Sequence, residues 1–155
     1  MYKTAFYSFY LPCALGMHIA GISDPTLFSK AKEICVAMGE YFQVQDDFLD
    51  CYGDPEVIGK VGTDIRDNKC SWLINMALAV CTAKQAKTLE NNYAKHDAKA
   101  EARVKKVFAE LKLDERFHAY EEQRHAELQT MIAQVQGMPP TIFSKLLARI
   151  YKRKK

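Results

Sequence analysis

Apolar residues recur at intervals of three and four over residues 27–49, and this spacing constrains the fold more than any other feature of the chain. They are Leu27, Ala31, Ile34, Cys35, Met38, Phe42 and Leu49. Such spacing places one apolar stripe along a helix. A cap and a proline at 23–25 predict its start, and the Gly and Pro of 51–55 predict its end.

Further helix signals follow along the chain, and strand signals are scarce. The predicted elements are a loop over 53–63, an apolar helix over 72–80, helices capped by Thr82, Asp97 and Asp114, and a last helix from about Thr141 after Pro139-Pro140. Their short connections predict an all-α, antiparallel bundle. Residues 2–20 are apolar on nearly every side and start without an N-cap, so we expect further helices, absent from this sequence, to cover them.

Composition excludes several classes of protein. The 155 residues suit one domain, with 48% hydrophobic and 26% charged residues, and a net charge of +3 is too small to indicate nucleic-acid binding. No run resembles a membrane span or a signal peptide. Five cysteines without a CxxC pair predict reduced thiols rather than a disulfide framework, and four histidines without an HxxxH or HExxH pattern disfavour zinc. We therefore expect a cytoplasmic protein.

The segment GEYFQVQDDFLD at 39–50 carries the chemistry. On a helix, Asp46 and Asp50 share a face, and Asp47 reaches the same rim. Several carboxylates on an apolar helix near its C-terminus repel one another and oppose the helix dipole. A Mg²⁺ ion would compensate them, since it prefers oxygen ligands and is typically shared with substrate phosphates. The alternative is a solvated acidic patch.

Three lysines are candidates for binding phosphate, and one of them lies in a glycine-containing segment. Lys60 lies between Gly59 and Gly62, and with Lys69 and Lys3 it could reach a phosphate that the metal already holds. Taken singly, each lysine is more often a solvated surface residue. No P-loop pattern is present.

Several of these segments resemble the trans-isoprenyl diphosphate synthase family. GEYFQVQDDFLD is similar to its second aspartate-rich motif, and GKVGTDIRDNKCSWL, YKTAFYSFYLP and IYKRKK resemble the eukaryotic farnesyl diphosphate synthases within it. The likeness runs along the whole chain but covers only the C-terminal part of a family member. It implies a helical bundle of the isoprenoid synthase type, with residues 1–155 forming part of a single domain.

The resemblance also implies a reaction and its participants. Family members use Mg²⁺ to ionise an allylic diphosphate, dimethylallyl or geranyl, and condense it with isopentenyl diphosphate to give farnesyl diphosphate. By position, Asp46 would bind the metal directly, while Asp47, Asp50 and Asp64 would hold metal or its waters. The other implied contacts are Lys3, Lys60 and Lys69 to the diphosphates, Thr4 and Gln43 to the carbocation, and Arg153 of the basic tail to isopentenyl diphosphate. A full-length family member is expected to be a homodimer.

One departure from the family pattern matters. The first aspartate-rich motif is absent, so this chain alone is expected to be inactive or nearly so. The main alternative is a non-catalytic helical module that retains a Mg²⁺–diphosphate half-site or an oligomerisation surface. A further alternative is a related terpene cyclase or a longer-chain synthase. The cyclase is disfavoured because cyclases usually carry an NSE-type motif where this chain has a DDxxD. A nucleic-acid or membrane-surface binder is opposed by the mixed charges of residues 84–116, despite the basic end at 152–155.

Overall fold

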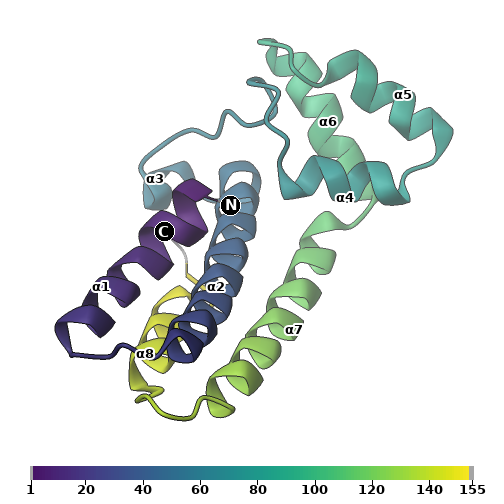
Figure 1. The fold of residues 1–155 in the computed structure, drawn as a ribbon. Coiled ribbons are helices and arrows are strands. Elements are labelled where there is room, and N and C mark those ends of the chain that lie inside the picture. The colour runs from purple at the N-terminus through teal and green to yellow at the C-terminus, as the bar shows by residue number, and fades with distance from the viewer. Residues whose placement is uncertain (1, 154–155) are drawn as a thin grey trace. The chain divides into compact units, whose positions relative to one another are not determined.

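The computed structural model describes residues 2–153, and within that range every regular element is a helix (Figure 1). The elements are η1 (Tyr2–Tyr10), α1 (Leu11–Ile19), α2 (Pro25–Tyr52), α3 (Pro55–Ile58), α4 (Trp72–Val80), α5 (Ala83–Asn92), α6 (Ala98–Glu110), α7 (Leu113–Ala133) and α8 (Thr141–Ile150). The all-α prediction is confirmed. Among the described residues, no helix has the length and apolar character needed to cross a bilayer.

Local capping chemistry sets several of the helix starts, as the sequence predicts. The Thr82 side chain accepts a hydrogen bond from the backbone N–H of Gln85, whose side chain accepts one in return from the Thr82 N–H, so the capping box is complete. Asp97 caps α6 by accepting from the N–H of Ala100. Asp24 accepts from the N–H of Thr26 at the start of α2.

Three local predictions need correction. The expected loop over 53–63 contains the single turn α3, because Asp54 caps its start and Gly59 ends it in the left-handed conformation at φ 81°. Asp114 does not cap α7 but lies in its first turn, since the helix already begins at the fully buried Leu113. The first helix opens as the π-helix η1 before continuing as α1.

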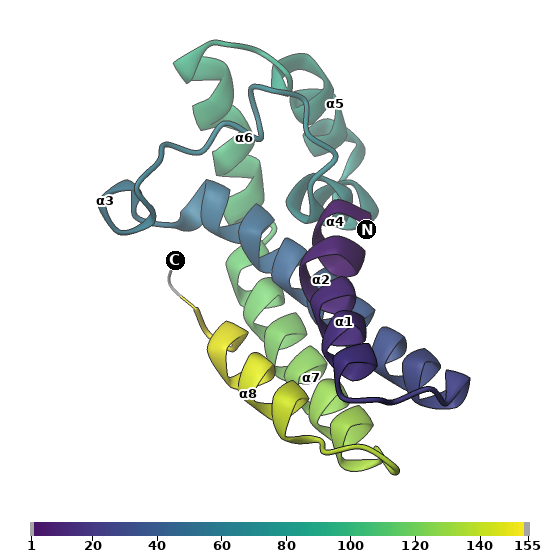
Figure 2. The same ribbon diagram turned by 60° about the vertical axis from the view of Figure 1, so that its left-hand side comes forward.

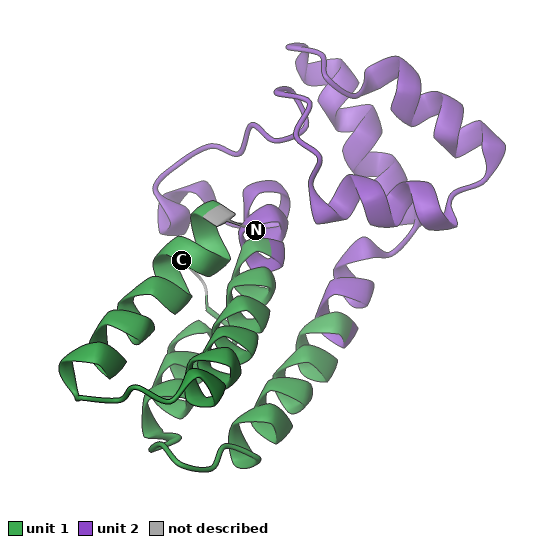
Figure 3. Cartoon of the chain, viewed as in Figure 1, with its two compact units in different colours: residues 1–43, 120–153 green, residues 44–119, 154–155 purple. Residues whose placement is uncertain are grey.

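The chain divides into two compact units, coloured separately in Figure 3. Unit 1 comprises residues 1–43 and 120–153, and unit 2 comprises residues 44–119 of the described chain. The boundaries fall inside α2 and inside α7, so each of these helices contributes to both units.

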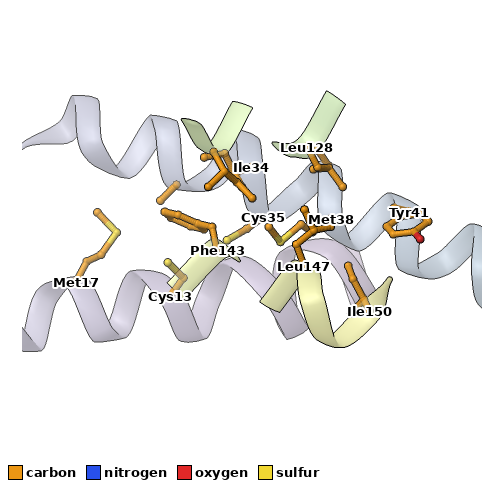
Figure 4. Close-up of a cluster of buried hydrophobic side chains, with 13 residues drawn as sticks. Cys13, Met17, Ile34, Cys35, Met38, Tyr41, Leu128, Phe143, Leu147 and Ile150 are labelled. Carbon is orange, nitrogen blue, oxygen red and sulfur yellow. The ribbon is translucent and has the colours of Figure 1, made fainter. Parts of the chain in front are cut away.

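Unit 1 is a bundle of η1–α1, the first part of α2, the second part of α7, and α8. Helices α1 and α2 run side by side and antiparallel in both ribbon views (Figures 1 and 2). Figure 4 shows the shared core, whose buried members are Cys13, Met17, Ala31, Ile34, Cys35, Ala37, Met38, Tyr41, Leu128, Ile132, Phe143, Leu147 and Ile150. Gly39 permits η1 to touch α2, because a Cβ atom there would overlap the backbone of Ala5.

Unit 2 has its own core, built by α4, α5, α6, the start of α7 and one residue of the long loop. Its buried members are Ile65, Leu73, Ile74, Ala77, Leu89, Val104, Val107, Phe108 and Leu113. Burying Ile65 anchors the loop that follows α3. The Ala94 N–H donates to the Ile65 carbonyl at 2.9 Å, so that loop is tied to the end of α5 as well.

Candidate functional site

The centre of the candidate site in unit 2 is Lys69, whose ammonium group lies between two carboxylates. Its Nζ is 3.0 Å from Asp47 Oδ1 and 2.8 Å from Asp64 Oδ2. Asp47 is only 5% exposed, so this pair is held in a partly desolvated setting. The arrangement brings together a residue of α2 and two residues of the loop that precedes α4.

The second oxygen of Asp47 is also engaged. The backbone N–H of Trp72, at the first position of α4, donates to Asp47 Oδ2 at 2.7 Å. The first N–H groups of a helix have no partner inside the helix, and the positive end of the helix dipole favours a carboxylate there. Asp47 therefore joins α2 to the start of α4 while its other oxygen holds Lys69.

Asp50 holds the loop at a second point. Its Oδ2 accepts a hydrogen bond from the Asp64 backbone N–H at 2.9 Å, and its Oδ1 lies 3.8 Å from the Nζ of Lys60. Gly62 allows this approach, because a Cβ there would overlap the Asp50 carbonyl group. The structure thus places three of the four carboxylates predicted to hold metal, Asp47, Asp50 and Asp64, beside the two lysines of the loop.

Burial and charge perturb the titration of this cluster. Burial raises the pKa of Asp64 above its ordinary value, and the contact with Lys69 opposes this rise only in part. Burial lowers the pKa of Lys69, but its hydrogen bonds to Asp64 and Asp47 outweigh that effect and raise the pKa overall. Lys69 therefore stays protonated at neutral pH and serves as a fixed positive charge.

The acidic cluster has the ligand chemistry that Mg²⁺ prefers, but its oxygens are partly occupied. Mg²⁺ needs only one or two carboxylates when substrate phosphates supply further oxygens. Within residues 2–153, no three or more His, Cys, Asp or Glu side chains are grouped so that they could hold a metal ion. Asp46 and Asp50 are both half-buried. Asp50 accepts from the Asp64 N–H and lies beside Lys60, and Asp47 is held by Trp72 and Lys69. The residues fit a magnesium ion shared with a diphosphate better than a cage made of protein alone.

Unit 1 brings together a second set of predicted residues. The Thr4 hydroxyl in η1 donates to Gln43 Oε1 in α2 at 2.9 Å. One residue earlier on α2, the Phe42 carbonyl accepts from Arg153 Nη2 at 3.2 Å, and the Arg153 guanidinium lies 3.8 Å from the centre of the Phe42 ring. Lys3 is exposed on η1. Arg153 therefore reaches the turn of α2 that carries Gln43.

Sequence reasoning missed two supporting residues. Phe42 appears in the sequence only as part of the apolar stripe, yet its ring faces Phe9 edge-on at 5.5 Å and supports Arg153. Tyr93 donates its hydroxyl to the Lys69 carbonyl at 2.7 Å and so fixes the backbone of the central lysine. No local pattern marks Tyr93, because its partner lies 24 residues earlier in the chain.

The chain is similar in sequence to known proteins along its whole length. A farnesyl pyrophosphate synthase of Schizosaccharomyces pombe is 53% identical over 158 residues, and one of Rattus norvegicus is 50% identical over 155. The alignments cover 100% and 99% of this chain but 46% and 44% of those proteins. The chain therefore spans less than half the length of these relatives.

Structural similarity is equally high. The farnesyl diphosphate synthase of T. brucei, solved in complex with risedronate, superposes with a TM-score of 0.91 at 35% identity, over 99% of this chain and 44% of that one. This similarity confirms the predicted isoprenoid synthase fold. The model of the family described as polyprenyl synthetase matches residues 1–111, well over half of the sequence. The chain belongs to the polyprenyl synthetase family.

Proposed function

We propose that this chain supplies the second-motif half of a farnesyl diphosphate synthase. The whole enzyme would condense an allylic diphosphate with isopentenyl diphosphate. The observation that carries the proposal is the cluster in which Lys69 is held between Asp47 and Asp64, with Lys60 beside Asp50. In a member of the polyprenyl synthetase family, such alternating charges suit a diphosphate that arrives with a divalent cation.

Residues of this chain would act mainly on the leaving group. When bound, Mg²⁺ would neutralise charge on the diphosphate, with Asp46 as its direct carboxylate ligand and Asp50 holding the metal or its waters. Lys60 and Lys69 would bind that diphosphate as compact positive charges. The family resemblance implies a diphosphate contact for Lys3 as well. Asp47 and Asp64 would orient Lys69, which cannot rotate freely while both pairs persist.

The hydrogen bond between Thr4 and Gln43 would act on the carbocation. Because the Thr4 hydroxyl gives its hydrogen to Gln43 Oε1, the lone pairs of Thr4 Oγ1 remain available to face positive charge. Dipoles that are fixed before the reaction stabilise a developing charge without reorganisation. Arg153, held on Phe42, would contribute to binding isopentenyl diphosphate and to excluding water.

The remaining features of the proposal follow from family membership. Residues 1–155 would form the C-terminal part of a single isoprenoid synthase domain, since the family match crosses from unit 1 into unit 2. The full-length form would be a cytoplasmic homodimer. By itself this chain would be inactive, because the pattern DDxxD occurs once in its sequence and the family reaction uses two facing motifs.

Two measurements test the proposal. With Mg²⁺ present, calorimetry should detect inorganic pyrophosphate binding to the chain, and Asp46→Ala should abolish it. Asp67→Ala, which removes an exposed acid of the same unit, should leave binding unchanged. Absence of binding to a folded chain would refute the half-site. Incubation with geranyl and isopentenyl diphosphates and Mg²⁺ should yield no farnesyl diphosphate, and robust product would contradict the expected inactivity.

The non-catalytic module remains the second candidate, because the chain spans only 46% of its S. pombe relative. It predicts the same pyrophosphate binding. The two are separated by adding a separately expressed N-terminal segment of that relative. Recovered farnesyl diphosphate synthesis favours the enzyme, and binding without turnover favours the module.

A further inference from the structure

Residues 151–153, here called the terminal turn, direct the chain back toward α2 after α8 ends. Helix α8 ends at Ile150, which Figure 4 shows at the same end of the unit 1 core as Tyr41. Lys152 then adopts the left-handed conformation at φ 50°, which favours glycine over residues with a Cβ atom. The next residue, Arg153, donates to the Phe42 carbonyl. A strained residue persists only where surrounding contacts hold it, so the terminal turn needs support from outside itself.

Glu122 on α7 supplies that support. Its Oε2 accepts a hydrogen bond from the Tyr151 hydroxyl at 2.8 Å, and its Oε1 lies 2.7 Å from the Nζ of Lys152. The contacts with Lys152 and Tyr151 lower the pKa of Glu122, so this carboxyl is ionised at neutral pH. The Tyr151 ring also stacks on the ring of His125, which lies one turn further along α7, with the ring centres 3.7 Å apart. One carboxylate therefore holds the side chains of two successive residues of the terminal turn.

The part of α7 that carries Glu122 is itself fixed against α2. Glu121 is 4% exposed, and its Oε1 accepts a hydrogen bond from the buried Tyr41 hydroxyl at 2.9 Å. Tyr41 directly precedes Phe42 in the sequence, as Glu121 precedes Glu122. The buried pair thus sets the distance between the carboxylate that holds the terminal turn and the ring on which Arg153 rests.

The contacts of Glu122 are exposed, in contrast to this neighbouring pair. The side chains of Glu122 and Lys152 are 55% and 58% exposed. A single exposed ion pair contributes little to the stability of a protein. Removing the carboxylate should therefore leave unit 1 folded while it changes where the terminal turn lies. Glu122 is thus better suited to positioning this turn than to stabilising the fold.

We propose that Glu122 is a positioning residue for isopentenyl diphosphate, because it holds the terminal turn so that Arg153 rests on Phe42 before the substrate arrives. The inference rests on the proposed function, which assigns Arg153 to this diphosphate. Glu122 itself would not touch the substrate. A ligand binds more weakly when only a fraction of the protein has the competent arrangement, since the apparent dissociation constant rises in inverse proportion to that fraction. Release of the terminal turn should therefore weaken the binding of isopentenyl diphosphate in particular.

Nuclear magnetic resonance of this chain tests the position of the terminal turn. The ring protons of His125, identified by their loss in His125→Gln, should resonate upfield of those of a solvated histidine, because the stacked Tyr151 ring shields them. Glu122→Ala should shift them toward the solvated value. Glu122→Gln should shift them less, since its amide oxygen still accepts from the Tyr151 hydroxyl although it carries no charge to pair with Lys152.

Glu115→Ala is the matched control on the same helix. Glu115 and Lys112 form an ion pair of 3.0 Å, and the Glu115 side chain is 64% exposed, so it resembles Glu122 in all but its contact with the terminal turn. This variant should not move the His125 resonances. Resonances that also stay in place in Glu122→Ala would refute the inference.

Steady-state kinetics of the full-length protein test the role in binding. Glu122→Ala should raise the KM for isopentenyl diphosphate about fivefold and leave the KM for geranyl diphosphate unchanged. Partial unfolding would instead lower kcat and leave both KM values as they are. Tyr151→Phe should raise the same KM, and adding it to Glu122→Ala should change little further, because both substitutions remove one hydrogen bond.

The outcomes distinguish the inference from the proposed function. A full-length protein that makes farnesyl diphosphate, but whose KM for isopentenyl diphosphate is the same in Glu122→Ala, overturns the inference alone. An equal rise in both KM values overturns it too, since the effect is then not confined to the substrate assigned to Arg153. An unmodified full-length protein that makes no farnesyl diphosphate refutes the proposed function, and the role of Glu122 in substrate binding with it.

Discussion

Replacing Lys69 by Met should destabilise the chain more than its partial exposure suggests. The ammonium contacts two carboxylates, and the Asp47 and Asp64 side chains are only 7% and 14% exposed. Removing one partner of a fully buried pair costs about 3–5 kcal/mol, and because the Lys69 side chain is 37% exposed, solvent screening reduces the expected loss to about 1–3 kcal/mol.

The loss should depend on pH. Burial already raises the pKa of Asp64, and without Lys69 it should rise further. An acid whose pKa is higher in the folded than in the unfolded chain binds more protons when folded, so stability falls as pH rises between the two values. The deficit of Lys69→Met should therefore be largest at pH 7 and shrink as pH approaches the unfolded pKa of about 3.9.

Urea unfolding at pH 7 and pH 4.5 measures this effect. Trp72 is the only tryptophan, and its backbone N–H donates to Asp47, so the indole fluorescence reports on this cluster. Lys87→Met is the matched control, because Lys87 and Glu90 form an ion pair of 2.8 Å whose side chains are 66% and 69% exposed. Its cost should be close to zero, because solvent screens an exposed ion pair. The reasoning is wrong if Lys69→Met lowers the free energy of unfolding no more than this control does. It is also wrong if the loss at pH 4.5 is as large as at pH 7.

Further substitutions test the packing and one helix cap by thermal or urea unfolding, and the support of Arg153 by ligand binding. Gly39→Ala should cost about 1–3 kcal/mol, because its methyl group would meet the Ala5 backbone. Gly16→Ala, where no atom lies within 4 Å, should instead stabilise α1 by up to about 1 kcal/mol, and equal effects would contradict the close approach at Gly39. Thr82→Ala should cost about 1 kcal/mol, and restoration by Thr82→Ser would attribute the loss to the cap. Under the proposed function, Phe42→Leu should weaken binding of isopentenyl diphosphate by the full-length protein but spare pyrophosphate binding by this chain, since Arg153 would lose its aromatic support.

The sequence predicts most helix starts because capping is local chemistry. Thr82 and Gln85 lie three residues apart, and their reciprocal bonds need no other part of the chain. The same reasoning is wrong for Asp114, because α7 already begins at the buried Leu113, one residue before the predicted cap. The π-helix η1 is beyond any local pattern, since its contact with α2 depends on Gly39, more than thirty residues away.

The candidate site shows the same division between local and distant interactions. Helical spacing predicts that Asp46, Asp47 and Asp50 share one region of α2. It does not predict that Lys69 meets Asp47, because that pairing depends on the path of the loop over 53–71. The resemblance to a known family named Lys69 as a supporting residue, but only the structure reveals that its charge is divided between Asp47 and Asp64.

The raised pKa of Lys69 has a consequence for how the cluster exchanges ions. A cation that enters between Asp47 and Asp64 must displace an ammonium group rather than a hydrogen ion. Lys69 would therefore release no proton when a metal binds there. Lys69 would thus add no buffer-dependent term to the heat of binding measured by calorimetry. The displaced Lys69 ammonium would keep its positive charge and could then form an ion pair with the anion that enters with the metal.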